Sequence, residues 1–94
     1  MITAVTIITL SIPGNNSLKG KRALIKSLMA RVRKKFNVSS AEVDLNDMHR
    51  SAVLAFSTVS TEKAIIENTF EKLCEWIEIN FPDVMVTKRE IELY

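Results

Sequence analysis

The sequence predicts an α+β fold in which four strands and two helices follow one another in the order β-α-β-β-α-β. Four stretches are rich in β-branched residues or alternate apolar with polar residues, as strands do. Two longer stretches repeat apolar residues at the three- and four-residue spacing of a helix. Short polar or proline-containing stretches separate the six elements and mark the turns between them.

The first strand is predicted at residues 2–12, which are mostly β-branched and contain no glycine or proline. Alternate residues of a strand point to opposite faces of its sheet. The face that we expect helices to cover carries Ile2, Ala4, Thr6, Ile8, Leu10 and Ile12. The other face is polar at its ends but has apolar Val5 and Ile7 in its middle.

The first helix is predicted at residues 17–37, with Ser17 or Asn16 as its N-cap. Gly20 is a weak choice so early in a helix, because glycine costs about 0.5–1 kcal/mol relative to alanine there. The apolar face of the helix comprises Leu18, Ile25, Leu28, Met29, Val32 and Phe36. Beside that face, four cationic side chains fall within an arc of about 60°, given 100° per residue: Lys19, Arg22, Lys26 and Arg33.

Charge is divided unequally along the chain. Residues 1–41 contain eight Lys and Arg residues and no acid, whereas residues 42–94 contain five basic and eleven acidic residues. Such asymmetry suggests a polyanionic partner or head-to-tail association of identical chains. Two helices that are merely well solvated, one basic and one acidic, explain it equally well.

Two further strands are predicted at residues 38–45 and 51–59, joined by a tight turn at residues 46–49. In the earlier strand we expect Ala41 and Val43 to share one face and Glu42 to lie on the outward face. The later strand has apolar residues on both faces, which suggests a central position. The helix-covered face of that strand carries Ala52, Leu54 and Phe56, and its other face carries Val53, Ala55 and Val59.

The second helix is predicted at residues 62–80, capped by Ser60 or Thr61, and Pro82 prevents its continuation. Cys74 lies beside the apolar stripe and is expected to be a packing residue. The stripe itself comprises Ile66, Phe70, Leu73, Ile77 and Phe81. A last strand is predicted at residues 84–93.

These elements predict one ferredoxin-like βαββαβ domain over residues 1–94, with both helices packed on one face of a four-stranded antiparallel sheet. The other sheet face then stays open to solvent or to a partner. Its apolar residues Val5, Ile7, Val53 and Ala55 form a candidate patch for homodimerisation.

No catalytic or cofactor-binding motif emerges from the sequence. One His and one Cys, His49 and Cys74, are too few for a usual metal site, so we expect neither metal nor cofactor. Strand alternation alone explains Glu42 and Asp44, and Asp47 lies in the turn. No apolar run approaches the 18–20 residues of a membrane span, and a single cysteine suits a reducing cytoplasm. A weak anion site is predicted at the first helix start, from Ser17, Lys19 and Lys21.

The stretches 17–22 (SLKGKR), 31–39 (RVRKKFNVS) and 41–44 (AEVD) resemble the YlxP-like family, small bacterial proteins of undefined function. A weaker match continues through Asp47, Ala52, Val59 and Ser60. The sequence departs from the family pattern at Gly20, His49 and Ser51, where Glu, Trp and Arg are expected. The resemblance implies a ferredoxin-like fold. It also implies a role near RNA or the ribosome, because genes of this family often lie beside those for translation initiation and ribosome maturation.

Two functions are therefore predicted. In the first, the protein is a non-enzymatic cytoplasmic accessory protein that docks on structured RNA or the ribosome through Lys19, Arg22, Lys26 and Arg33. Base stacking on the sheet is not expected, because Phe56 is the only aromatic residue of the two central strands. In the second, the protein is a homodimeric adaptor that uses its open sheet face. An enzyme is a third, less favoured class, since no catalytic set is evident.

Overall fold

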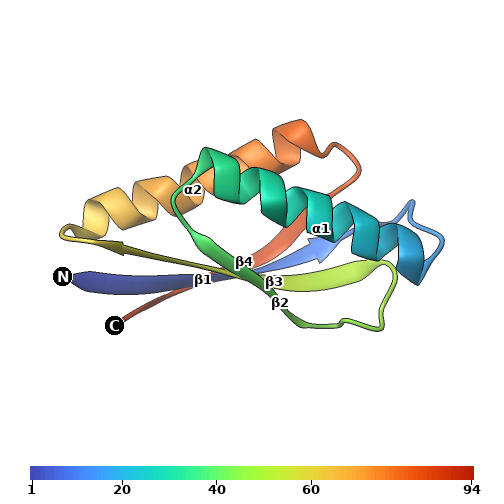
Figure 1. Cartoon of the computed structure of the whole chain (residues 1–94), viewed down its shortest axis with the longest axis horizontal. Coiled ribbons are helices and arrows are strands. Elements are labelled where there is room, and N and C mark those ends of the chain that lie inside the picture. The colour runs from blue at the N-terminus through green and yellow to red at the C-terminus, as the bar shows by residue number, and fades with distance from the viewer.

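The computed structural model describes all of residues 1–94. Both helices lie on the same face of one four-stranded sheet (Figure 1). The elements are β1 (Ile2–Ser11), α1 (Leu18–Lys35), β2 (Ser39–Asp44), β3 (Ser51–Ser60), α2 (Lys63–Asn80) and β4 (Met85–Leu93). The strand order is β2-β3-β1-β4, and every pair is antiparallel. The predicted ferredoxin-like arrangement is confirmed.

The strand order makes β1 and β3 the central strands and leaves β2 and β4 at the two edges. Across the central pair, Ile7 lies opposite Ala55 and Ile8 opposite Leu54. The two chain ends lie at one end of the sheet (Figure 1), where the backbone N–H of Tyr94 donates to the carbonyl of Thr3 at 2.7 Å. Neither helix contains an apolar stretch of the length that a membrane span requires.

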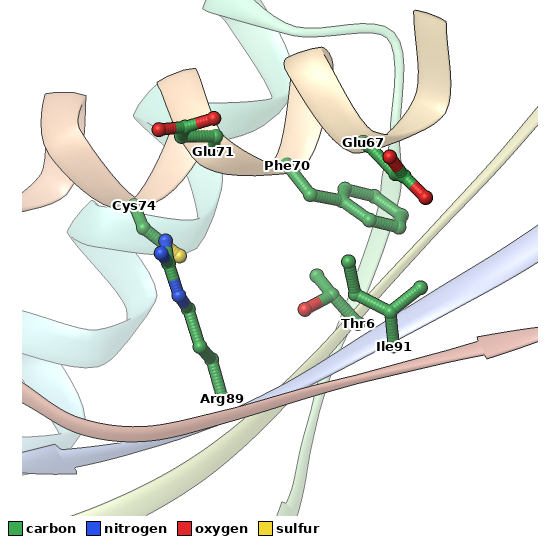
Figure 2. A pocket seen from close by; sticks show the side chains of 7 residues that line it. All are labelled: Thr6, Glu67, Phe70, Glu71, Cys74, Arg89 and Ile91. Atoms are coloured by element: carbon green, nitrogen blue, oxygen red, sulfur yellow. The ribbon is translucent and has the colours of Figure 1, made fainter. Parts of the chain in front are cut away.

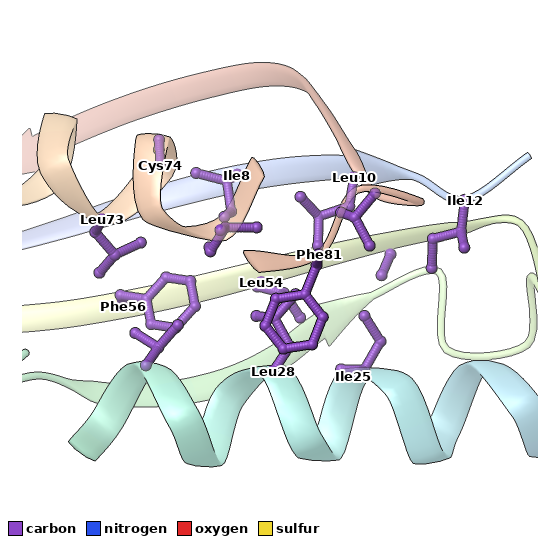
Figure 3. Packing of buried hydrophobic residues seen from close by; sticks show 14 residues of the cluster. Ile8, Leu10, Ile12, Ile25, Leu28, Leu54, Phe56, Leu73, Cys74 and Phe81 are labelled. Atoms are coloured by element: carbon purple, nitrogen blue, oxygen red, sulfur yellow. The ribbon is translucent and has the colours of Figure 1, made fainter. Parts of the chain in front are cut away.

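The main core lies between the sheet and both helices (Figure 3). Each large apolar side chain buried there contributes roughly 1.5–3 kcal/mol to folding. The helices contribute Ile25, Leu28, Val32, Leu73, Cys74 and Ile77, the C-cap position of α2 contributes Phe81, and the sheet contributes Ile8, Leu10, Ala52, Leu54 and Phe56 among others. The apolar faces predicted for β1, β3 and α2 are therefore confirmed. On α1 the central residues of the predicted face are buried, while Leu18, Met29 and Phe36 are half-buried.

The two helices begin differently. Ser17 is the N-cap of α1, and its Oγ accepts a hydrogen bond from the backbone N–H of Gly20 at 3.0 Å. The predicted cap of α2 by Ser60 or Thr61 is wrong, because Glu62 occupies the cap position and makes no side-chain cap bond. Strand β3 continues through Ser60, which pairs with Ile2, so the helix starts later than expected.

The predicted faces of β2 are also wrong. Glu42 and Ser40 lie half-buried on the helix side, whereas Ala41 and Val43 are exposed on the open face. The register with β3 explains this orientation: Glu42 lies opposite Leu54, whose side chain belongs to the helix-covered core. An inward carboxylate is tolerated only where a positive charge compensates it, and α1 supplies that charge.

Candidate nucleic-acid interface on the first helix

Four cationic side chains form what we call the basic ridge: Lys19, Arg22, Lys26 and Arg33. All four are exposed, and all four lie on α1. At a rise of 1.5 Å per residue, their backbone positions span roughly 21 Å along the helix. Arg33 Nη1 donates a hydrogen bond to Ser40 Oγ of β2, which places the ridge on the flank of α1 that faces this edge strand.

No member of the basic ridge is neutralised by a carboxylate. The molecule has three ion pairs within 4 Å, and none includes a ridge residue. Two of these pairs each lie within a single element: Lys63 pairs with Glu67 on α2, and Lys88 pairs with Glu90 on β4. The ridge is thus a line of positive charge without a nearby negative charge. Such a surface attracts a polyanion.

The third ion pair lies beneath the ridge and joins Lys21 to Glu42. The Lys21 side chain is fully buried, with its Nζ 2.9 Å from Glu42 Oε2 and 2.6 Å from the backbone carbonyl of Leu45. The Glu42 oxygen lies outside hydrogen-bond geometry, so attraction between the charges holds this contact more than a directed bond does. Because Lys21 occupies Glu42, that carboxylate is not left for a ridge residue.

The predicted anion site at the start of α1 loses most of its groups. Lys21 is buried against Glu42 and cannot reach a ligand at the helix start. Ser17 Oγ is already engaged by the N–H of Gly20, and the backbone carbonyl of Ser17 accepts from Lys21 N. Of the three predicted residues, only Lys19 presents a free exposed side chain. We therefore assign Lys19 to the ridge alone.

The start of α1 is also linked to the turn between β2 and β3. Asn15 Nδ2 donates to the carbonyls of Ser17 and His49. A Cβ atom at Gly20 would lie 2.9 Å from Asn15 Oδ1. Local packing therefore explains the glycine at position 20. A larger residue would crowd the Asn15 side chain, whose hydrogen bonds to Ser17 and His49 we call the Asn15 bridge. Gly20 and His49, two of the departures from the family pattern, both adjoin this side chain.

The acidic residues of β2 and its turn do not converge. Glu42 points inward to Lys21, and Asp44 Oδ1 accepts from the backbone N–H of Leu45. Asp47 is exposed in the turn. No group of three His, Cys, Asp or Glu side chains in the structure is arranged to hold a metal ion.

A hollow of about 410 Å³ lies between α2 and β4 (Figure 2). Glu67 and Glu71 stand on its helix side, and Arg89 approaches Cys74 from the strand. Burial raises the pKa of the Cys74 thiol, and the nearby Arg89 guanidinium offsets part of that rise. The thiol is therefore mostly protonated at neutral pH, as expected for a packing residue rather than a nucleophile.

The open sheet face carries the predicted patch of Val5, Ile7, Val53 and Ala55. All four are half-buried, and none is covered by a helix. Ile7 pairs with Ala55, and Thr9 pairs with Val53, so the patch straddles the two central strands. Along β4, the register places Lys88, Glu90 and Glu92 opposite the open-face residues of β1, which gives this face a charged border.

Two features of the site were not predicted from the sequence. Lys21 is a lysine on the apolar face of α1, four residues before Ile25 and seven before Leu28, and this position was the signal for its burial. The second feature is the contact of Arg31 with two aromatic rings, which joins residues far apart in the chain. Neither residue belongs to the predicted basic arc.

Fold and site define a small ferredoxin-like α+β protein whose first helix carries an exposed basic ridge without carboxylate partners. The comparisons with known proteins agree on a family: residues 3–91 match the model described as "Protein of unknown function (DUF503)". The chain is 31% identical over 78 residues to "Uncharacterized protein YlxP" of Bacillus subtilis (strain 168), covering 83% of this chain and 84% of that protein. The chain therefore belongs to the DUF503 family, and its resemblance to YlxP-like proteins is confirmed.

One solved structure is also similar. The crystal structure of protein SO0527 from Shewanella oneidensis aligns with 98% of this chain and 89% of its own, at 12% sequence identity and a TM-score of 0.42. A similarity at this level supports no inference about function.

Proposed function

We propose that this protein is a non-enzymatic accessory protein that docks on structured RNA, including the ribosome, through its basic ridge. The observation that carries the proposal is the exposure of Lys19, Arg22, Lys26 and Arg33 with no carboxylate within 4 Å. Each such cation can replace a counterion on a phosphate, and the release of that counterion drives binding. The rigid helix fixes the spacing of the cations.

The test is RNA binding by fluorescence anisotropy with a labelled, structured RNA at several salt concentrations. Four phosphate contacts predict a slope of about −3.6 for the logarithm of affinity against the logarithm of salt. The affinity should then fall roughly 100-fold between 50 and 200 mM salt. A variant with all four ridge residues changed to Gln should lose most of that slope.

A matched control removes the same number of charges elsewhere. Changing Lys63, Lys72, Lys88 and Arg89 to Gln lowers the net charge equally but leaves the ridge intact. We expect this control to keep most of the affinity and the slope. Equal losses in the two variants would show that net charge alone governs binding, and unchanged binding without the ridge would reject the proposal.

Association with the ribosome needs its own measurement. The wild-type protein should sediment with ribosomes at low salt and be released at high salt, and the four-Gln ridge variant should stay in the soluble fraction. Ribonuclease treatment of a native lysate should abolish capture of the partner by the immobilised protein. Capture that survives ribonuclease would point to a protein partner instead.

The open sheet face favours a second candidate function, a homodimeric adaptor. Val5, Ile7, Val53 and Ala55 are adjacent apolar residues on the central strands, where one copy can cover those of another. Sedimentation should then show a concentration-dependent dimer that Val5→Lys abolishes. A monomer at all concentrations, unaffected by Val5→Lys, would exclude this function.

A further inference from the structure

The side of α1 that faces α2 presents a second cationic group of a different kind. The Arg31 guanidinium lies 4.8 Å from the ring centre of Phe81 and 5.4 Å from that of Trp76. Trp76 in turn packs edge-on against Phe36 and Phe81, with ring centres 6.2 Å apart in both pairs. We call these four residues the aromatic corner. Its rings join the main core, so Arg31 rests on a rigid base.

Arg31 is charged, exposed and unpaired. It takes part in none of the three ion pairs, and the same is true of its neighbours Lys34 and Lys35. These three cations and Trp76 line one open hollow of about 280 Å³. A guanidinium held over aromatic rings keeps its outer face and its N–H edges available to a ligand.

The lining of this hollow selects a particular chemistry. A lone phosphate would be attracted by the cations but has no flat surface for Arg31 and Trp76. A neutral aromatic ring could stack there but would leave Lys34 and Lys35 unused. A nucleotide supplies both a flat base and a phosphate, and bases stack readily on aromatic rings and on arginine planes.

We propose that the aromatic corner binds an unpaired nucleotide of an RNA, with its base stacked on the outer face of the Arg31 guanidinium above Trp76 and its phosphate held by Lys34 and Lys35. This inference rests on the proposed function, and it adds that the preferred RNA has a single-stranded loop rather than only a duplex. The ridge would hold the backbone of the paired stem, and the corner would hold a base that has left the stack.

Trp76 gives a direct readout, because it is the only tryptophan in the chain. The wild-type protein is titrated with an RNA hairpin carrying an unpaired loop and with a fully paired duplex of equal length. A base stacked at the corner should quench tryptophan emission saturably with the hairpin. The duplex and inorganic phosphate should leave the emission unchanged. Hairpin binding seen by anisotropy without quenching, or equal quenching by the duplex, would overturn the proposal.

Two conservative arginine variants separate stacking from charge. Arg31→Lys keeps the charge but loses the flat guanidinium, and we expect about 10-fold weaker hairpin binding with unchanged duplex binding. Arg89→Lys on β4 is the matched control, because Arg89 is exposed, forms no ion pair and lies outside both the ridge and the corner, and it should bind both RNAs almost as the wild type does. Equal hairpin affinities for the two variants would contradict stacking at the corner. Circular dichroism melting shows that each variant remains folded.

The same measurements separate this inference from the proposed function. If removal of the ridge leaves duplex binding unchanged while the hairpin still quenches Trp76, the ridge proposal fails and the corner stands. If the ridge governs binding but neither quenching nor an Arg31→Lys effect appears, the corner fails and the ridge stands. A protein that binds no RNA at all overturns both. Quenching by a free mononucleotide as strong as that by the hairpin would replace an RNA ligand with a small nucleotide.

Discussion

Opposite charges are arranged differently on the two sides of the molecule. On one side α1 passes beside β2, and on the other α2 passes beside β4. Beside β2, Lys21 of the helix and Glu42 of the strand form a buried ion pair, with Lys21 Nζ 2.9 Å from Glu42 Oε2. Beside β4, the helix supplies Glu67 and Glu71 and the strand Arg89, and a hollow of about 410 Å³ stays open between them. Arg89 forms no ion pair there.

This difference shows how the exposed cations of a helix can remain without carboxylate partners. Glu42 is the only carboxylate within 4 Å of an α1 cation, and Lys21 takes it into the interior. The exposed cations of α1 therefore have no carboxylate nearby with which to form an ion pair. On the β4 side both signs of charge remain at the surface, so neither dominates. On the β2 side, the buried pair thus removes the one acid near α1 from the surface, whereas on the β4 side acids and bases stay together at the surface.

The largest expected effect comes from breaking the buried pair. Lys21→Met should lower the free energy of unfolding by about 3 kcal/mol, because Glu42 and the Leu45 carbonyl then lose their partner away from water. Urea denaturation measures this loss. Lys19→Met, an exposed change on the same helical turn, should alter the free energy by less than about 0.5 kcal/mol.

Replacing both members of the pair sharpens that prediction. The double variant Lys21→Met, Glu42→Leu leaves no unpaired charge, and we expect a stability within about 1 kcal/mol of the wild type or above it. A single Lys21→Met variant as stable as the wild type would mean that the pair is not structurally important. A double variant as unstable as the single one would assign the loss to packing rather than charge.

A smaller effect is expected at the Asn15 bridge on the same side. Glycine to alanine within a helix usually adds about 0.5–1 kcal/mol of stability. At Gly20 this gain should be absent, because the new Cβ meets Asn15 Oδ1 at 2.9 Å. In an Asn15→Ala background much of the gain should return. A double-mutant cycle by urea denaturation measures the coupling, and additive effects would show that the two residues do not interact.

The β4 side should show a pH effect that the β2 side lacks. Burial raises the pKa of Cys74 above its usual value of 9.0, so the folded thiol holds its proton when the unfolded thiol has lost it. This contribution is fully present below pH 9 and is lost as pH rises from there through the folded pKa. The stability of the wild type should therefore decline more steeply in this range than that of Cys74→Ala. Parallel declines would contradict the shift.

The smallest effect on stability is expected at Arg89. This residue is exposed and in no ion pair, so Arg89→Ala should change the free energy of unfolding by less than about 0.5 kcal/mol. The pKa of Cys74 should nevertheless rise further, since the guanidinium lowers it. The reaction of Cys74 with a thiol reagent should then need a higher pH than in the wild type. An unchanged pH profile would remove Arg89 from the thiol's surroundings.

Sequence periodicity predicted most of the fold because the relevant signals are local. The apolar stripe of α2, including Phe70 and Ile77, and the buried face of β1, including Ile8, follow from spacing along a single element. The Ser17 cap is equally local, since the capping oxygen and the N–H that it accepts lie three residues apart. The cap of α2 was missed because the pairing of β3 with β1 extends that strand through Ser60.

The candidate site divides in the same way. The basic ridge could be predicted, since Lys19, Arg22, Lys26 and Arg33 share one helix and helical geometry alone brings them together. The aromatic corner could not, because Arg31 and Phe81 lie 50 positions apart and only the packing of α1 beside α2 makes them neighbours. The RNA contacts proposed for both remain predictions.

By itself, the sequence determined the order of the elements, the apolar face of each helix and the uneven distribution of charge, because these properties belong to neighbouring residues. Only the tertiary structure decided which face of β2 points inward. That strand alternates Ala41 and Val43 with Ser40 and Glu42, so local pattern favours burying the wrong pair. The register against β3 and the buried cation of Lys21 reverse this preference, since a carboxylate facing a positive charge is stable in the interior.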